Sequence, residues 1–220
     1  MKLSSSSLFR RFIPAALAPL LIIQAYGQGY YELDGGTDTI STTFTFDGES
    51  EGDTHIPQPP YFEGAGQRDA LLVFGGGSLS LTAGADVSVS NFDNHTAFAR
   101  VGYGTDGTLN IGTGASFRVG HDGRYANFHV GHDATGTVNQ TGGTTSLIGS
   151  VNIGANGGNG TYTISGGTFN FDHTPDGGTS LLSVGFNNSA VSTGTSSGVF
   201  NIDGGTVNIL SSHGGGTRFI

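Results

Sequence analysis

A pair of glycines seven residues apart recurs five times along the chain and constrains its fold more than any other feature. Each pair encloses a run in which apolar and polar residues alternate, and a second strand-like run follows the later glycine. The pairs are Gly77/Gly84, Gly107/Gly114, Gly136/Gly143, Gly160/Gly167 and Gly198/Gly205. Alternation with a period of two is typical of a strand with one buried face. Its repetition predicts a stack of similar β units.

The residues between the paired glycines have fixed roles. Apolar residues stand two and four places after the first glycine in most units, as in Leu109/Ile111 and Phe200/Ile202. The place between them is always polar. Its occupants are Ser80, Asn110, Asn139, Thr163 and Asn201. If the units stack, these side chains are expected to form a hydrogen-bonded ladder on an outer face, and the glycines permit positive-φ turns.

Two departures from the repeat carry expectations of their own. Gln140 stands where other units have Leu or Ile, so this unit is expected to bury less apolar surface or to be locally reversed. The second strand also begins one residue earlier after the Gly-Gly turns than after the others. A shift of one residue would turn every side chain to the opposite face. The Gly-Gly turns are therefore expected to differ by one residue or a bulge.

A short apolar-glycine step precedes most units, at Val101-Gly102, Val130-Gly131, Ile153-Gly154 and Val184-Gly185. It supplies a third strand-like piece, and the units begin 30, 29, 24 and 38 residues apart. Rungs of three strands and roughly 20–30 residues are typical of repeat solenoids. The sequence thus predicts an all-β parallel β-helix with about five repeat units. The alternative is an antiparallel β-sandwich, which also has short strands and glycine turns.

Three segments carry a family resemblance: TGTVNQTGGT (135–144), NGTYTISGGTFNF (159–171) and SGVFNIDGGTVNI (197–209). They resemble the autotransporter-associated β-strand repeats of large bacterial surface and secreted proteins, which also occur in exported proteins with a PEP-CTERM sorting signal. The resemblance covers residues 70–210. It implies a right-handed β-helix of passenger type at the cell surface or released from it.

The first 27 residues have the order of a secretory signal peptide. Lys2, Arg10 and Arg11 precede an apolar run of 12 residues, Phe12 to Ile23, and Ala25 and Gly27 then place small residues at the −3 and −1 positions of a cleavage site. This run is shorter than the about 20 residues that cross a bilayer, so cleavage after Gly27 is expected. We therefore expect a secreted or cell-surface protein whose mature chain has no membrane span.

The mature composition fits that location. Removal of residues 1–27 leaves five basic residues, all Arg, against 17 acidic ones, and the chain has no Cys. Nucleic acids and anionic membranes recruit Lys and Arg clusters, so neither is expected as a partner. Glycans, cell-surface components and other copies of the chain are the expected partners.

The expected domain order follows the repeat. Residues 28–69 form N-terminal cap strands and a loop, in which Tyr30–Phe46 supplies one or two strands and Asp47–Gln67 a proline-rich loop. Residues 70–212 form the β-helix. Residues 213–220 are expected to leave the solenoid end uncapped, either because the chain is a fragment of a longer one or because a partner covers the end.

Two catalytic-looking motifs lack their structural context. Gly102–Gly107 matches G-x-G-x-x-G, but a dinucleotide site needs a helix after the glycines and here a strand is expected. Gly194–Gly198 matches G-x-S-x-G, but a nucleophile elbow also leads into a helix. No catalytic or cofactor-binding residue is therefore assigned.

The metal candidates are weak. Gly120-His121-Asp122 and Gly131-His132-Asp133 are near-duplicates, and their four side chains would bind a transition metal only if they converge. The alternative is a pair of exposed turns duplicated with the repeat. Ca²⁺ is a second possibility, because Gly35–Asp38 resembles half of a calcium-binding nonapeptide repeat, but that pattern is not iterated.

The expected function is that of a structural or adhesive β-helix, not an enzyme, which displays loops for contact with surfaces, glycans or other copies. The alternative is a carbohydrate-active β-helix enzyme, a polysaccharide lyase or glycoside hydrolase. Such enzymes use paired carboxylates or a basic residue with Ca²⁺. Asp172 and Asp176 flank His173, but the Asp-Asp and Arg-x-Lys motifs of polygalacturonase-like enzymes do not occur.

Overall fold

The computed structural model describes residues 31–46, 67–90, 96–120, 126–172, 181–186, 194–210 and 218–219. These residues form 19 strands in three parallel sheets. Sheet A comprises β1 (Tyr31–Asp34), β4 (Gln67–Phe74), β7 (Thr96–Tyr103), β10 (Ala126–His132), β13 (Val151–Ala155), β16 (Leu181–Phe186) and β19 (Arg218–Phe219). Sheet B comprises β2 (Thr37–Ile40), β5 (Gly77–Leu81), β8 (Gly107–Ile111), β11 (Thr135–Gln140), β14 (Asn159–Ile164) and β17 (Ser197–Ile202). Sheet C comprises β3 (Thr43–Phe46), β6 (Asp86–Val89), β9 (Ser116–Val119), β12 (Thr144–Ile148), β15 (Thr168–Asp172) and β18 (Thr206–Leu210).

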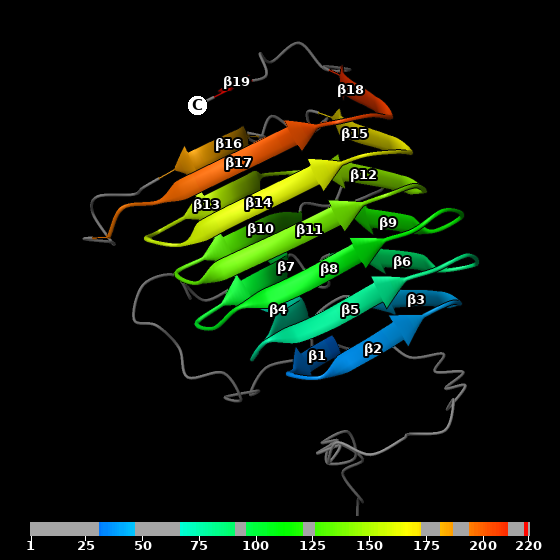
Figure 1. The fold of residues 1–220 in the computed structure, drawn as a ribbon, viewed down its shortest axis with the longest axis horizontal. Helices are drawn as coiled ribbons and strands as arrows, with labels where there is room; N and C mark the ends of the chain where they lie inside the picture. The colour runs from blue at the N-terminus through cyan, green and yellow to red at the C-terminus, as the bar shows by residue number, and fades with distance from the viewer. Residues whose placement is uncertain are drawn as a thin grey trace, which may run out of the picture.

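The chain visits sheets A, B and C in turn and then returns to sheet A one level further along. Figure 1 shows the resulting stack, from the blue strands β1–β3 at one end to the orange and red strands β17 and β18 at the other. Every pairing between these strands is parallel. The parallel β-helix is confirmed, and the antiparallel β-sandwich is wrong.

The first rung lies within the segment for which cap strands were expected. Its strands β1, β2 and β3 pair in parallel with β4, β5 and β6. The segment therefore contributes three strands, where one or two were expected, and the described strands form six rungs and the first strand of a seventh. The proline-rich segment 47–66 lies outside the described residues.

The first glycine of each pair stacks at the corner where sheet A turns into sheet B. Gly107 pairs with Gly77 and Gly136, and Gly160 pairs with Gly136 and Gly198. A Cβ atom on Gly136 would lie 2.1 Å from both the Val101 carbonyl oxygen and the Gly131 nitrogen. Backbone atoms of β7 and β10 thus occupy the space that a side chain would need, which explains why this column is glycine.

The apolar-glycine steps form the second half of this corner. Val101, Val130, Ile153 and Val184 are in register in sheet A, and the glycines that follow them all have φ between +71° and +74°. That conformation is easy for glycine and strained for other residues. The step is therefore a bend just before the end of each sheet A strand, because the residue after the glycine still pairs in sheet A.

The two kinds of turn between sheets B and C differ as expected. Leu81 and Ile164 occupy one column of sheet B, and Asp86 and Thr168 occupy one column of sheet C. Four residues connect the first pair and three connect the second. The Gly-Gly turn is one residue shorter, which keeps all second strands in register.

Gln140 does not reverse its rung. Its side chain is buried in the core column of Ile111 and Ile164. Its Nε2 donates to the Thr168 carbonyl at 2.9 Å, and its Oε1 accepts from Tyr162 Oη at 2.8 Å and from Thr145 Oγ1 at 3.1 Å. The expectation that this rung is locally reversed was wrong, because Thr145 of the same rung and Tyr162 and Thr168 of the next rung supply partners for a buried amide.

Replacing Gln140 with Leu is expected to destabilise the protein, although Leu or Ile occupies this place in other rungs. The change leaves the Tyr162 hydroxyl and the Thr168 carbonyl with fewer partners, which costs about 1–3 kcal/mol. Adding Thr145→Val and Tyr162→Phe should restore most of the loss, because the whole network then becomes apolar. Urea unfolding measures both variants, and a stabilising Gln140→Leu change would contradict this account.

The core is continuous from the first rung to the fifth and open at the last. Its largest fully buried side chains include Phe117, Phe128, Tyr162, Phe169 and Phe171. At the far end, Ile202 and Ile209 continue inward-facing columns but are 56% and 39% exposed. β19 pairs with the start of β16, where Phe219 is in register with Leu182. Apolar core surface is thus uncovered at β17 and β18 in the described part of the chain.

The predicted polar ladder runs along the outside of sheet B. Asn139 Nδ2 donates to Asn110 Oδ1 at 3.1 Å, and Asn201 Nδ2 donates to Thr163 Oγ1 at 3.4 Å. Sheet C carries a second ladder, in which Asn208 Nδ2 donates to Asn170 Oδ1 at 2.9 Å. These bonds join neighbouring rungs through side chains as well as backbone.

Candidate functional site

The outer face of sheet A differs from the outer faces of the other two sheets. One outward column passes from Leu72 through Arg100, His129 and Asn152 to Ser183. Outward positions on sheets B and C are mostly half-buried or exposed, whereas Leu72, Arg100, His129 and Ser183 are buried. Charged and aromatic side chains thus gather on the outer face of sheet A, at positions where the other two sheets carry short polar side chains. We call this group the sheet A cluster; it comprises Asp69, Phe98, Arg100, Tyr103, His129 and His132.

Arg100 is the charged centre of this cluster. Its Nη1 lies 3.1 Å and 3.2 Å from the two carboxylate oxygens of Asp69, which comes from β4. The guanidinium carbon also lies 4.4 Å from the ring centroids of both Phe98 and Tyr103, a distance at which cation–π attraction operates. Burial raises the pKa of Asp69, while Arg100 and then His132 act against that rise.

Two histidines of β10 extend the cluster. The rings of His129 and His132 stack with centroids 5.0 Å apart and planes at 5°. His129 also meets the edge of Phe98, and His132 lies tilted against Tyr103. Burial, followed by the charges of His132 and Arg100, holds the pKa of His129 well below its usual value.

Two asparagines set the hydrogen bonding of the rings. Asn152 Nδ2 lies 3.0 Å from His129 Nε2, and Asn156 Nδ2 lies 2.8 Å from His132 Nε2. Ser183 Oγ donates to Asn152 Oδ1, which directs the Asn152 amino group at His129. The Nε2 atom of His129 therefore accepts, and a neutral His129 ring carries its proton on Nδ1. Neither Nδ1 has a hydrogen-bond partner in the described part of the protein.

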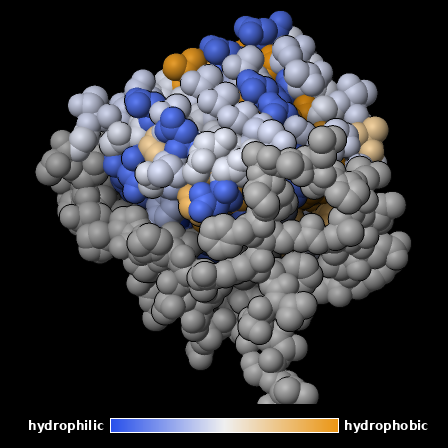
Figure 2. Space-filling view, turned by 60° about the horizontal axis from the view of Figure 1, so that its bottom comes forward, coloured by the Kyte–Doolittle hydropathy of each residue, from blue (hydrophilic) through white to orange (hydrophobic). Residues whose placement is uncertain are grey.

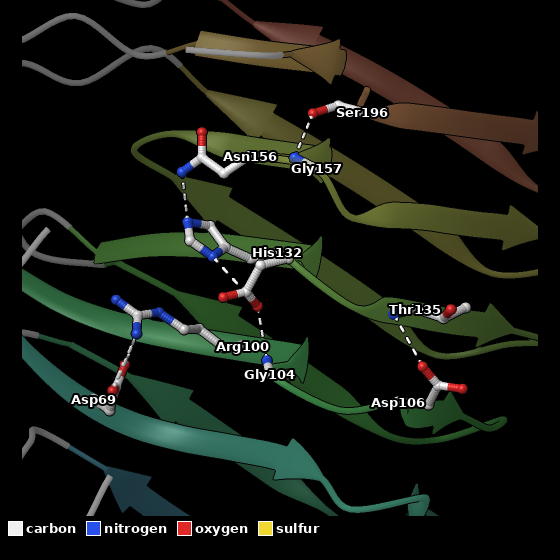
Figure 3. A network of polar contacts seen from close by, with 10 residues as sticks. Asp69, Arg100, Gly104, Asp106, His132, Thr135, Asn156, Gly157 and Ser196 are labelled. Carbon is white, nitrogen blue, oxygen red and sulfur yellow. Dashed lines mark hydrogen bonds and ion pairs between the residues drawn. The ribbon is translucent and has the colours of Figure 1, made fainter. Parts of the chain in front are cut away.

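The adjoining A/B corner is held by side chains that bond to the backbone of the next rung. Asp133 Oδ1 accepts from the Gly104 nitrogen at 2.7 Å, and Asp106 Oδ1 accepts from the Thr135 nitrogen at 3.1 Å. Figure 3 shows these caps beside Arg100–Asp69 and His132–Asn156. A shallow groove of about 600 Å³ crosses the corner and is lined by turn residues that include Asp106 and Asp133.

Only two of the four predicted metal ligands lie among the described residues. His132 and Asp133 are described, with His132 Nδ1 3.9 Å from Asp133 Oδ1, whereas His121 and Asp122 lie outside the described residues. Among the described residues no three His, Asp or Glu side chains gather as metal ligands would. Asp38 of the calcium-like segment accepts from the Tyr31 hydroxyl at 2.8 Å.

The two catalytic-looking motifs lead into strands. Gly102–Gly107 leads into β8, and Gly194–Gly198 leads into β17. Ser196 Oγ accepts from the Gly157 nitrogen at 2.9 Å and so caps the neighbouring rung. Asp172 ends β15, while His173 and Asp176 lie outside the described residues.

Of the sheet A cluster, sequence reasoning singled out only His132, as a metal candidate. The residues of the cluster lie in the strands of sheet A, which the paired glycines do not delimit. In these strands only the apolar-glycine step was interpreted from the sequence. Asp69, Arg100 and His129 also come from three different rungs. A signal was available, because Arg100 and His129 both directly precede the valine of that step.

Comparison with protein-family models, with curated proteins and with solved structures gave no match. In the described part of the chain no helix has the length and apolarity needed to cross a membrane.

Proposed function

We propose that the mature chain is a secreted or cell-surface structural β-helix that displays polar faces and loops for contact with glycans, surfaces or other copies of itself. The observation that carries this proposal is the outer face of sheet B. Its two outward columns hold short polar side chains that are half-buried from the second rung to the fifth. They are Ser78, Thr108, Thr137 and Thr161 in one column, and Ser80, Asn110, Asn139 and Thr163 in the other.

This face is regular and uncharged over those rungs. Neighbouring strands of a sheet lie about 4.8 Å apart, so hydroxyl and amide groups recur at that interval. Part of the described surface turned forward in Figure 2 likewise shows mostly hydrophilic and near-neutral residues with isolated hydrophobic ones. A rigid polar array of this kind suits weak, multiple contacts with hydroxyl-rich polymers rather than the enclosure of one small molecule.

The resemblance of residues 70–210 to autotransporter-associated repeats and the signal-peptide pattern of residues 1–27 support export of this β-helix. The test is expression of the full chain in a bacterium, followed by fractionation and N-terminal sequencing. The proposal expects an extracellular or surface-bound chain that begins at Gln28. A chain that stays inside the cell with residues 1–27 attached would contradict it.

Self-association is proposed to use the open end of the core. The large hydrophobic residues that are exposed in the described part all lie on the last rung: Val184, Val199, Ile202, Ile209 and Leu210. Uncovered strand edges with apolar side chains favour association.

Ile202→Thr with Ile209→Thr is expected to shift the mature protein toward monomer in sedimentation velocity. The change removes apolar surface at the end of the stack and leaves the inner rungs intact. Ser80→Thr with Ser146→Thr, on the outer faces, is the matched control and should leave association unchanged. If the Ile202→Thr/Ile209→Thr variant has the same distribution of sedimentation coefficients as the wild type, association does not use the open end of the core.

A polysaccharide-active enzyme is the second candidate, because Asp106 and Asp133 line one groove on neighbouring rungs. One oxygen of each carboxylate already caps a backbone N–H, which argues for a structural role. Release of reducing ends or unsaturated products from purified polysaccharides would favour the enzyme, provided that Asp106→Asn abolishes it.

A further inference from the structure

The stacked rings of His129 and His132 are surrounded by groups that disfavour a positive charge. Arg100, from β7, is the nearest cation, and its partner Asp69, from β4, is already engaged. Asn152 and Asn156 present amino groups to the rings from β13 and the turn after it. Tyr103 contributes a neutral phenol ring, Asp133 Oδ1 lies 3.9 Å from His132 Nδ1, and Asp69 also interacts electrostatically with His132.

A proton on Nε2 would change the hydrogen bonding at each ring. The Nε2 atom would become a donor and would face the donating amino group of an asparagine. Asn156 can turn its amide, because its Oδ1 has no partner in the described part. If Asn152 turns, it loses the bond from Ser183 to its Oδ1, and the Ser183 hydroxyl is left with the longer bond to the Val151 carbonyl at 3.4 Å. Protonation of Nε2 is therefore more unfavourable for His129 than for His132.

We propose that the His129–His132 stack is an acid-sensitive contact, and that proton uptake by His129 separates the two rings and loosens the outer face of sheet A. The displaced His132 ring then competes with the Gly104 N–H for Asp133 Oδ1, so the effect reaches the A/B corner (Figure 3). The inference goes beyond the proposed display function, because it makes the exposed state of one face depend on pH.

The direction of the pH effect follows from linkage. In the folded state the pKa of His129 is lowered, whereas an exposed histidine titrates near 6.5. The opened state therefore binds more protons, and stability is lost as pH falls through about 6.5 and on toward the lowered pKa of the folded state. The raised pKa of Asp69 acts in the opposite direction, because a folded carboxyl that binds its proton more readily gains stability as pH falls.

The experiment compares thermal unfolding of the mature chain between pH 7.5 and 5 with that of His129→Gln. The wild type should lose about 3–6 °C in Tm over this range, above the pH at which ordinary carboxylates titrate. His129→Gln should lose most of this dependence, whatever its absolute Tm. His132→Gln should keep more of it, and Arg118→Gln, on the exposed face of sheet C, should keep it all.

Ring NMR of the wild-type chain provides a readout that does not depend on variant folding. The proposal expects the His129 ring to stay neutral well below pH 6.5 and to protonate together with faster amide exchange in β7, β10 and β13. A His129 ring that titrates at an ordinary value would overturn it. An unchanged pH dependence of Tm in His129→Gln would overturn it equally.

Discussion

Replacing Gly136 with Ala is expected to prevent stable folding of the mature chain, or to cost more than about 4 kcal/mol if it folds. The new Cβ atom would lie 2.1 Å from the Val101 carbonyl oxygen and from the Gly131 nitrogen. Both atoms belong to the backbone of sheet A and cannot move without separating rungs. Circular dichroism and urea unfolding give the measurement.

Gly104→Ala is the matched control. Gly104 lies at the same corner and has φ of +67°, but no atom lies within 4 Å of a Cβ built there. The cost should be the left-handed strain alone, about 1–2 kcal/mol. Equal losses in the two variants would contradict this account, because Gly136 does not have a positive φ and its loss is attributed to the close approach of neighbouring rungs alone.

Asp69→Asn is expected to cost about 3–5 kcal/mol, because it leaves the buried Arg100 guanidinium without a counter-charge. Arg100 is 3% exposed and Asp69 10% exposed at the side chain. The cation–π contacts with Phe98 and Tyr103 hold the guanidinium in place, so it cannot reach solvent at low cost. The loss is measured as the free energy of unfolding at pH 7.

Asp86→Asn removes a second ion pair that connects neighbouring rungs and serves as the control. Arg118 Nη2 lies 2.9 Å from Asp86 Oδ1, but these side chains are 43% and 38% exposed. An exposed pair contributes about 0–1 kcal/mol. If Asp69→Asn lowers the free energy of unfolding no more than Asp86→Asn does, the buried Arg100–Asp69 pair does not stabilise the protein as expected.

The sequence predicted the stacked architecture because its glycines fulfil steric requirements that recur in every rung. Gly107, Gly136 and Gly160 are paired with one another, and the one-residue difference between the two turn types was readable from the spacing of Phe117 and Phe169 after the preceding glycine. Local spacing carries this information because each rung contacts only its neighbours.

Other features depend on contacts between rungs that no local pattern encodes. Gln140 was misread because its partners Tyr162 and Thr168 belong to the next rung. Asp69 and Arg100 pair across two rungs at 31 residues' separation. The first rung was not recognised because Asp38 interrupts the apolar column of Leu79 and Leu109, and because β2 and β3 are joined by Ser41 and Thr42 alone, with no glycine seven places after Gly36.

Engineered disulfides test the stacked rungs most directly, because the chain has no Cys of its own. Thr108 and Thr137 are neighbours in sheet B, and Thr161 lies one rung further. Adjacent strands are about 4.8 Å apart, within the Cα range of a disulfide, and alternate rungs are about twice that distance. Thr108→Cys with Thr137→Cys should therefore oxidise readily in the folded chain, whereas Thr108→Cys with Thr161→Cys should stay reduced. Failure of the first pair, or equal oxidation of both, would contradict the β-helix on which the account depends.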